Sequence, residues 1–226
     1  MSAATQSPAT ATKLEELALA DYQIFISEIF RRLDAISASL SELNANPTHS
    51  DSWKNCDFCW FQMRKICEYL TVGIVLAHHC DTGAIADLGK WRPKDLLAQA
   101  SKLSNHPTPV QISPFFGSGP EGEKQIEPLA RPIRPDLISS VYGRCSELLH
   151  VGSLERILAG KLPSYDVSQM EAWLIGFRKL LSDHVVLLPG VQKIIVSLTG
   201  PTQTSTFILA SEGAGFDTSK LADFEF

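Results

Sequence analysis

Residues 13–44 have the sequence KLEELALADYQIFISEIFRRLDAISASLSELN, in which apolar side chains recur at steps of three and four residues. This spacing gathers them along one face of an α-helix and leaves the charged side chains on the other face. A helix of this length has about nine turns. Because its apolar face must pack against other elements, the segment predicts a helical bundle.

The segments that follow extend this bundle. Pro47 closes the first helix, and residues 50–52 (Ser-Asp-Ser) offer N-cap candidates for a second helix over residues 53–78. This second helix is apolar around much of its circumference, so we expect it to run through the middle of the bundle. Further helices are predicted over residues 93–103, from Pro135 to a stop at Gly152, over residues 154–162, and over residues 167–184, where the helix is again long.

The hydrophobic period then changes to two. Residues 193–198 and 205–210 alternate as strands do, and residues 200–203 (Gly-Pro-Thr-Gln) join them, which predicts an antiparallel hairpin. Within residues 104–134, where Pro and Gly recur every few positions, only residues 110–112 and 125–126 are strand-like. The predicted fold is therefore mainly α, a helical bundle with a small C-terminal antiparallel β-hairpin or sheet.

The predicted organisation along the chain has four parts. A disordered tail over residues 1–12 precedes the bundle, which spans residues 13–185 and contains the irregular insertion at 104–134. The hairpin region spans 186–212, and residues 213–226 form a loosely ordered tail.

The composition is that of an ordinary globular protein, with 44% hydrophobic and 20% charged residues among 226. A formal net charge of −5 argues against indiscriminate binding to nucleic acid, which depends on many Lys and Arg contacts to phosphates. The N-terminal residues lack the pattern of a signal peptide, and no segment has the apolar length of a membrane span. We expect a cytoplasmic protein, not associated with a membrane, whose five cysteines are reduced.

Arg144 and His150 are the residues that point to chemistry. Six positions apart on one helix, they lie about 120° apart around its axis and about 9 Å apart along it, with Glu147 between them. An imidazole can take a proton from a 2′-hydroxyl, and a guanidinium can hold the scissile phosphate and stabilise its transition state. Together they could cleave RNA without a metal or another cofactor, and Glu147 would complete the face that meets the substrate.

A structural role is the alternative for each of these residues. Arg144 could pair with Glu147 one turn away, while His150 serves the helix C-terminus electrostatically. Arg131 and Arg134 precede the helix in a proline-stiffened loop. They could hold flanking RNA phosphates, or they could simply be solvated.

The segment Tyr142-Gly143-Arg144-Cys-Ser-Glu-Leu-Leu-His150, placed late in a bundle after two long helices, resembles the HEPN superfamily (higher eukaryotes and prokaryotes nucleotide-binding domains). The resemblance implies a homodimer in which the Arg and His of both subunits share one cleft. It also implies a metal-independent endoribonuclease of a toxin–antitoxin or phage-defence system, with RNA as substrate and an antitoxin or other protein as partner. Arg144 would then bind the phosphate and His150 would act as acid and base. Other family members are non-catalytic interaction or nucleotide-binding scaffold modules.

The second predicted helix carries a set of cysteines and histidines and a set of aromatic residues, and we expect both sets to have structural roles. Cys56 and Cys59, with His78, His79 and Cys80, have zinc-like spacing, but one continuous helix would separate the two groups, so no metal site is expected. Four aromatic residues at the start of the same helix could stack bases, yet their helical spacing favours a place in the core. They are Trp53, Phe58, Trp60 and Phe61.

Overall fold

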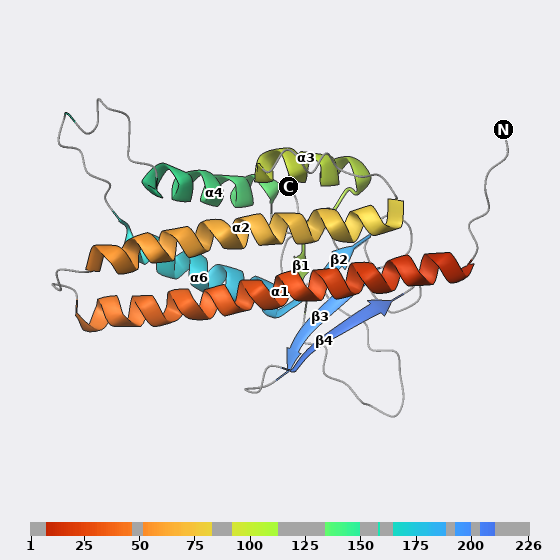
Figure 1. Cartoon of the computed structure of the whole chain (residues 1–226), viewed down its shortest axis with the longest axis horizontal. Helices are drawn as coiled ribbons and strands as arrows, with labels where there is room; N and C mark the ends of the chain where they lie inside the picture. The colour runs from red at the N-terminus through yellow and green to blue at the C-terminus, as the bar shows by residue number, and fades with distance from the viewer. Residues whose placement is uncertain are drawn as a thin grey trace.

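A computed structural model describes residues 8–46, 52–82, 92–112, 134–149, 158, 165–188, 193–199 and 204–210. Over these residues the chain is mainly helical and carries a small antiparallel sheet, which confirms the predicted fold class (Figure 1). The predicted segments 125–126 and 213–226 lie outside the described residues, as does all of 154–162 except Leu158.

Two long antiparallel helices form the framework, α1 (Pro8–Ala45) and α2 (Ser52–Thr82) (Figure 1). α1 begins five residues before its predicted start, which its sequence allows because proline is tolerated in the first turn of a helix. The two helices approach closely at Gly73, where an added Cβ would lie 3.3 Å from Phe25 Cβ. The apolar stripe of α1 is buried along its length, at Tyr22, Ile26, Ile29, Leu33, Ile36 and Leu40.

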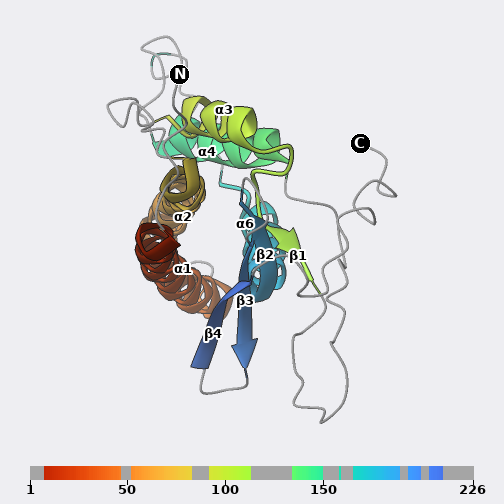
Figure 2. The same ribbon diagram turned by 90° about the vertical axis from the view of Figure 1, so that its right-hand side faces the viewer.

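Three shorter helices complete the bundle. α3 (Pro93–Leu103) and α4 (Pro135–Leu149) pack against α2 and against each other. α6 (Val167–Ser182) packs against both long helices, and it lies with the sheet beside the α1–α2 pair (Figure 2). The side chain of Asp166 caps α6 by accepting a hydrogen bond from the backbone N–H of Gln169.

The sheet has the order β1-β2-β3-β4, with every neighbouring pair antiparallel. The predicted hairpin is confirmed as β3 (Lys193–Thr199) and β4 (Thr204–Ala210), in register from Lys193↔Ala210 to Thr199↔Thr204. β1 (Val110–Gln111) confirms the predicted strand-like piece in the insertion and joins the edge of the sheet beside β2.

β2 (Asp183–Leu187) corrects the sequence prediction at the end of the last helix. We expected that helix to continue to His184, but it ends at Ser182 and the chain enters the strand without a loop. Val185 and Val186 are β-branched, and their pairing with Ile195 and Ile194 of β3 favours the strand over another helical turn.

One buried hydrogen bond ties the sheet to α1. His184 Nδ1 lies 3.0 Å from the carbonyl oxygen of Leu181, so Nδ1 carries the proton and donates it. His184 Nε2 is then the acceptor, and the Tyr22 hydroxyl donates to it at 2.9 Å. Both side chains are fully buried, so this hydrogen bond fixes β2 to α1 inside the core.

Among the described residues, no helix is both long enough and apolar enough to cross a membrane.

Candidate functional site

Arg144 lies on the outer face of α4 and is paired with Glu147. The distance from Arg144 Nη1 to the Glu147 carboxylate is 3.5 Å, and the two side chains are 47% and 66% exposed. This is the pairing expected if Arg144 has a structural role and not a catalytic one. His150, the proposed partner in catalysis, lies outside the described residues, as does Arg131.

Arg134 is likewise an exposed residue in an ion pair. Its guanidinium lies 3.4 Å from the Asp136 carboxylate, and both side chains are about two-thirds or more exposed, at 72% and 67%. Exposed pairs of this kind contribute about 1 kcal/mol or less, so both Arg134 and Arg144 can exchange their present partners for another anion at little cost.

The surroundings of Arg144 are open on one side and buried on the other. A Cβ built at Gly143 would have no neighbour within 4 Å among the described residues. Cys145, the next residue along, points into the core, and burial raises the pKa of its thiol to about 12. The thiol is therefore neutral and takes no part in the surface chemistry beside Arg144.

A second candidate site, which the sequence reasoning missed, lies on the α1–α2 face. We expected the aromatic residues of α2 in the core, and Trp60 is there at 1% exposure, in an edge contact with Trp173. Trp53, Phe58 and Phe61 are instead 54%, 39% and 44% exposed. Ile24 of α1 is 64% exposed. α2 contacts four other helices, but this side of it is uncovered by the described residues.

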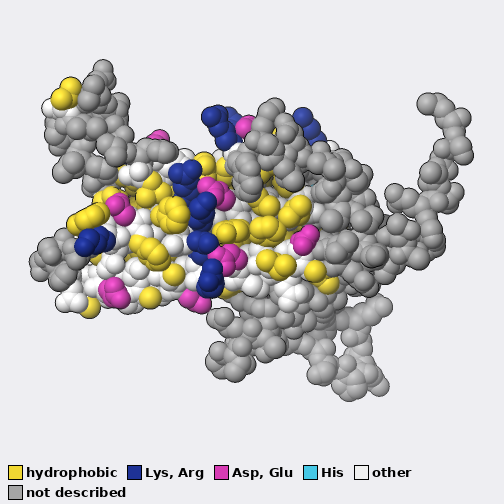
Figure 3. Space-filling view, viewed as in Figure 1, with side chains coloured by type: hydrophobic (Ala, Val, Ile, Leu, Met, Phe, Trp, Pro, Cys, Tyr) yellow, Lys and Arg dark blue, Asp and Glu magenta, His cyan; other side chains and the backbone are white. Residues whose placement is uncertain are grey.

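Charged side chains cross the same face from α1 over α2. Glu28 pairs with Arg31 and Arg32 on α1, at 2.8 and 2.6 Å. Glu68 pairs with Arg64 and Lys65 on α2, at 3.3 and 2.7 Å. We call these six residues the charged ladder. In Figure 3 a column of Lys and Arg crosses the molecule here, with acidic side chains beside it and hydrophobic side chains on both sides.

Two cations of the charged ladder make cation–π contacts with neighbouring aromatic rings. The Arg32 guanidinium lies 4.9 Å from the centre of the Tyr69 ring, and the Lys65 ammonium lies 5.9 Å from that of Phe61. The hydrogen bond from Arg31 and the charges of Arg31 and Arg32 lower the pKa of the Glu28 carboxyl, so it stays ionised at neutral pH. With four cations and two anions, the ladder carries a net charge of +2 on a chain whose formal charge is −5.

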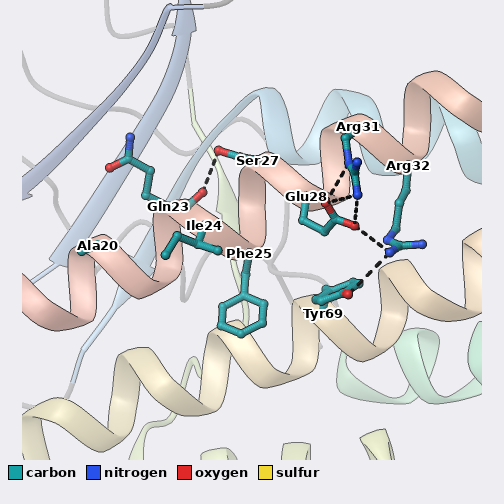
Figure 4. A pocket seen from close by; sticks show the side chains of 9 residues that line it. All are labelled: Ala20, Gln23, Ile24, Phe25, Ser27, Glu28, Arg31, Arg32 and Tyr69. Atoms are coloured by element: carbon teal, nitrogen blue, oxygen red, sulfur yellow. Dashed lines mark hydrogen bonds and ion pairs between the residues drawn. The ribbon is translucent and has the colours of Figure 1, made fainter.

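A groove of about 880 Å³ runs along α1 beside the ladder (Figure 4). Its apolar part is formed by Ile24, Phe25 and Tyr69, with the Phe25 and Tyr69 rings 5.8 Å apart. Its polar end is formed by Glu28, Arg31 and Arg32. The groove therefore offers an apolar surface that ends at a pair of guanidinium groups, an arrangement suited to an apolar ligand that carries a carboxylate.

Within the described part of the chain, no three His, Cys, Asp or Glu side chains gather as metal ligands. α2 is continuous from Ser52 to Thr82, so Cys56 and Cys80 are separated by about 36 Å along its axis, as the sequence interpretation anticipated.

The chain matches no protein-family model, no curated protein and no solved structure. The class of protein rests on the fold itself, a helical bundle edged by a small antiparallel sheet.

Proposed function

We propose that this protein is an interaction module that binds an amphipathic helical segment of a partner protein along the α1–α2 groove. The observation that carries the proposal is a net positive charged ladder placed between exposed large apolar side chains. Surfaces of this kind are where soluble proteins bind partners, because large exposed apolar side chains gathered on one face otherwise favour aggregation.

The charge of the ladder selects the chemistry of the partner. An amphipathic helix lays its apolar side chains into a groove, and acidic residues at its centre would meet Arg31, Arg32 and Lys65. A second copy of this chain is a poorer occupant of the same face, because each copy would bring a net +2 to the contact. The ladder is a poor track for nucleic acid, because non-specific affinity for phosphates needs many Lys and Arg contacts and the whole chain carries a formal charge of −5.

Binding can be tested with two synthetic amphipathic helices of about 18 residues. They carry the same leucine face, and their central residues are glutamate in one and lysine in the other. By fluorescence anisotropy we expect the acidic helix to bind in the micromolar range and the basic helix to bind at least about tenfold more weakly, a difference of about 1.4 kcal/mol. Arg31→Glu combined with Lys65→Glu should reverse this preference, because both side chains are on the exposed part of the ladder.

The matched control is Lys179→Glu, which changes an exposed charge on α6, away from the ladder. It should leave both affinities unchanged. Equal binding of the two helices, or tighter binding of a single-stranded RNA oligonucleotide than of the acidic helix, would contradict the proposal.

Metal-independent RNA cleavage is the second candidate, favoured by one observation: Arg144 is half exposed beside the open space at Gly143, and only a surface ion pair holds it. This candidate follows the HEPN resemblance, with a homodimer supplying Arg144 and His150 from both copies. With EDTA present, the wild type should produce RNA fragments ending in 2′,3′-cyclic phosphate. Arg144→Ala and His150→Ala should each lower the rate by at least about 100-fold, the usual contribution of acid–base or charge-stabilising groups.

The control is Arg134→Ala, which removes another exposed arginine near the same helix. It should lower the rate by less than about tenfold, since its predicted role is to hold flanking phosphate. RNA cleavage that persists in Arg144→Ala would remove the nuclease candidate and leave the interaction module.

A further inference from the structure

A second cavity, separate from the α1–α2 groove, lies where α2, α3 and α4 meet. It has a volume of about 310 Å³ and is lined by Arg64, Arg92, Pro93, Lys94, Ser139, Tyr142 and Ser146. Among these residues three are cations, three carry hydroxyl groups and none is a carboxylate. On a chain of formal charge −5, such a lining indicates an anion site.

Each helix contributes a different part of this cavity. Arg64 comes from α2, and Arg92 and Lys94 flank Pro93 at the start of α3, where the positive end of the helix dipole adds to the charge. The hydroxyl groups of α4 come from positions 139, 142 and 146, whose spacing of three and four residues places them on one face of the helix.

Contacts with Tyr142 and Glu68 fix the Arg64 guanidinium at the wall of the cavity. Its guanidinium lies 5.1 Å from the centre of the Tyr142 ring, and its Nη2 donates to the Tyr142 hydroxyl at 3.1 Å. Its Nε lies 3.3 Å from Glu68, which does not line the cavity. A guanidinium fixed in this way is preorganised to bind an anion, because little side-chain entropy is left to lose.

Ser146 is the feature that points to a ligand. Its Oγ is buried, and it has no hydrogen-bond partner within the described part of the chain. By contrast, Ser139 Oγ on the same face donates to the carbonyl of Pro135 at 3.1 Å. A buried hydroxyl without a partner is costly, and an acceptor oxygen in the cavity would satisfy it.

From these observations we infer that the cavity between α2, α3 and α4 binds the phosphate group of a small phosphomonoester. Arginine forks match phosphate oxygens, and lysine adds a point charge. The cavity is at the small end of the range for ligand sites, which suits one phosphate with a small organic group attached. The cavity shares Arg64 with the charged ladder but no residue with the lining of the α1–α2 groove, and Arg92, Lys94 and Ser146 take no part in the ladder.

The test is an NMR titration of the full chain with inorganic phosphate, O-phosphoserine and adenosine 5′-monophosphate, at ionic strength matched with sodium chloride. All three should shift the amides of residues 92–95 and 142–146, and the two monoesters should bind more tightly than inorganic phosphate. A phosphomonoester has its second pKa near 6, so affinity should rise between pH 5.5 and pH 7.5 as the dianion forms.

Substitutions can distinguish a defined phosphate site from non-specific electrostatic attraction to the protein surface. Arg92→Gln with Lys94→Gln should weaken phosphoserine binding by at least tenfold, whereas Lys102→Gln, an exposed charge at the other end of α3, should leave it unchanged. Ser146→Ala should weaken binding several-fold without lowering the melting temperature of the free protein, because the lost hydroxyl has no partner among the described residues. Equal loss in Lys102→Gln, or shifts spread over all surface lysines, would overturn the inference.

Discussion

Replacing Trp60 with alanine is expected to lower the free energy of unfolding by about 3 to 5 kcal/mol. Trp60 is 1% exposed, and its ring meets that of Trp173 at 80° with their centres 5.3 Å apart. The substitution removes the largest fully buried side chain of α2 and leaves a cavity between α2 and α6 that the surrounding helices can only partly fill. Urea unfolding monitored by circular dichroism measures the change.

Trp53→Ala is the matched control, because it removes the same side chain from the same helix at a position that is 54% exposed. It should change the stability by less than about 1 kcal/mol. Similar losses from the two variants would mean that Trp60 is not in the core, and the placement of α6 against α2 would be wrong.

Lowering the pH from 7.5 to 4.5 is expected to remove about 2 to 3 kcal/mol of stability through His184 alone. Burial lowers the pKa of this imidazole from 6.5 to about 4 in the folded protein, and the backbone hydrogen bond to Leu181 opposes only part of that shift. Between these two pKa values the unfolded chain binds the proton and the folded chain does not. Stability is therefore complete above pH 6.5 and is lost as the pH falls towards 4.

His184→Gln removes the titration and keeps an amide that can donate and accept hydrogen bonds. In urea unfolding at pH 7.5 and 4.5, this variant should lose about 2 to 3 kcal/mol less than the wild type between the two conditions. A smaller dependence of the same sign should persist, because burial also lowers the pKa of His78. If the wild type and His184→Gln lose the same stability between the two pH values, the pH dependence arises at other groups. That result would contradict the buried Tyr22–His184 hydrogen bond.

The helices and the hairpin were predictable because their signals are local. Apolar residues at steps of three and four define α1, and the alternation on either side of residues 200–203 defines β3 and β4 as an antiparallel hairpin. β2 was not predictable in this way. Its residues extend the apolar pattern of α6, and they become a strand only through pairing with β3 on one side and with β1, which lies far away in the sequence, on the other.

The α1–α2 groove was missed because hydrophobicity alone does not say which side of a helix is covered. Ile24, Phe25 and Ile26 are consecutive, and three consecutive residues on a helix cannot all face one core. That run was the available signal: Ile26 is buried, while Ile24 is exposed beside the groove. The ion pairs of Glu28 and Glu68 follow from i, i+3 and i, i+4 spacing, but their alignment across two helices needs the tertiary structure.

Chemical-shift mapping with the acidic amphipathic helix tests the central claim most directly, because it reports where the ligand binds as well as whether it binds. With isotope-labelled full chain, we expect the largest amide shifts at Ile24, Phe25, Arg31 and Tyr69, saturating in the micromolar range, and smaller shifts along α4. Saturable shifts centred on α4 or on the sheet, or none at millimolar peptide, would contradict the assignment of the α1–α2 groove as the binding surface.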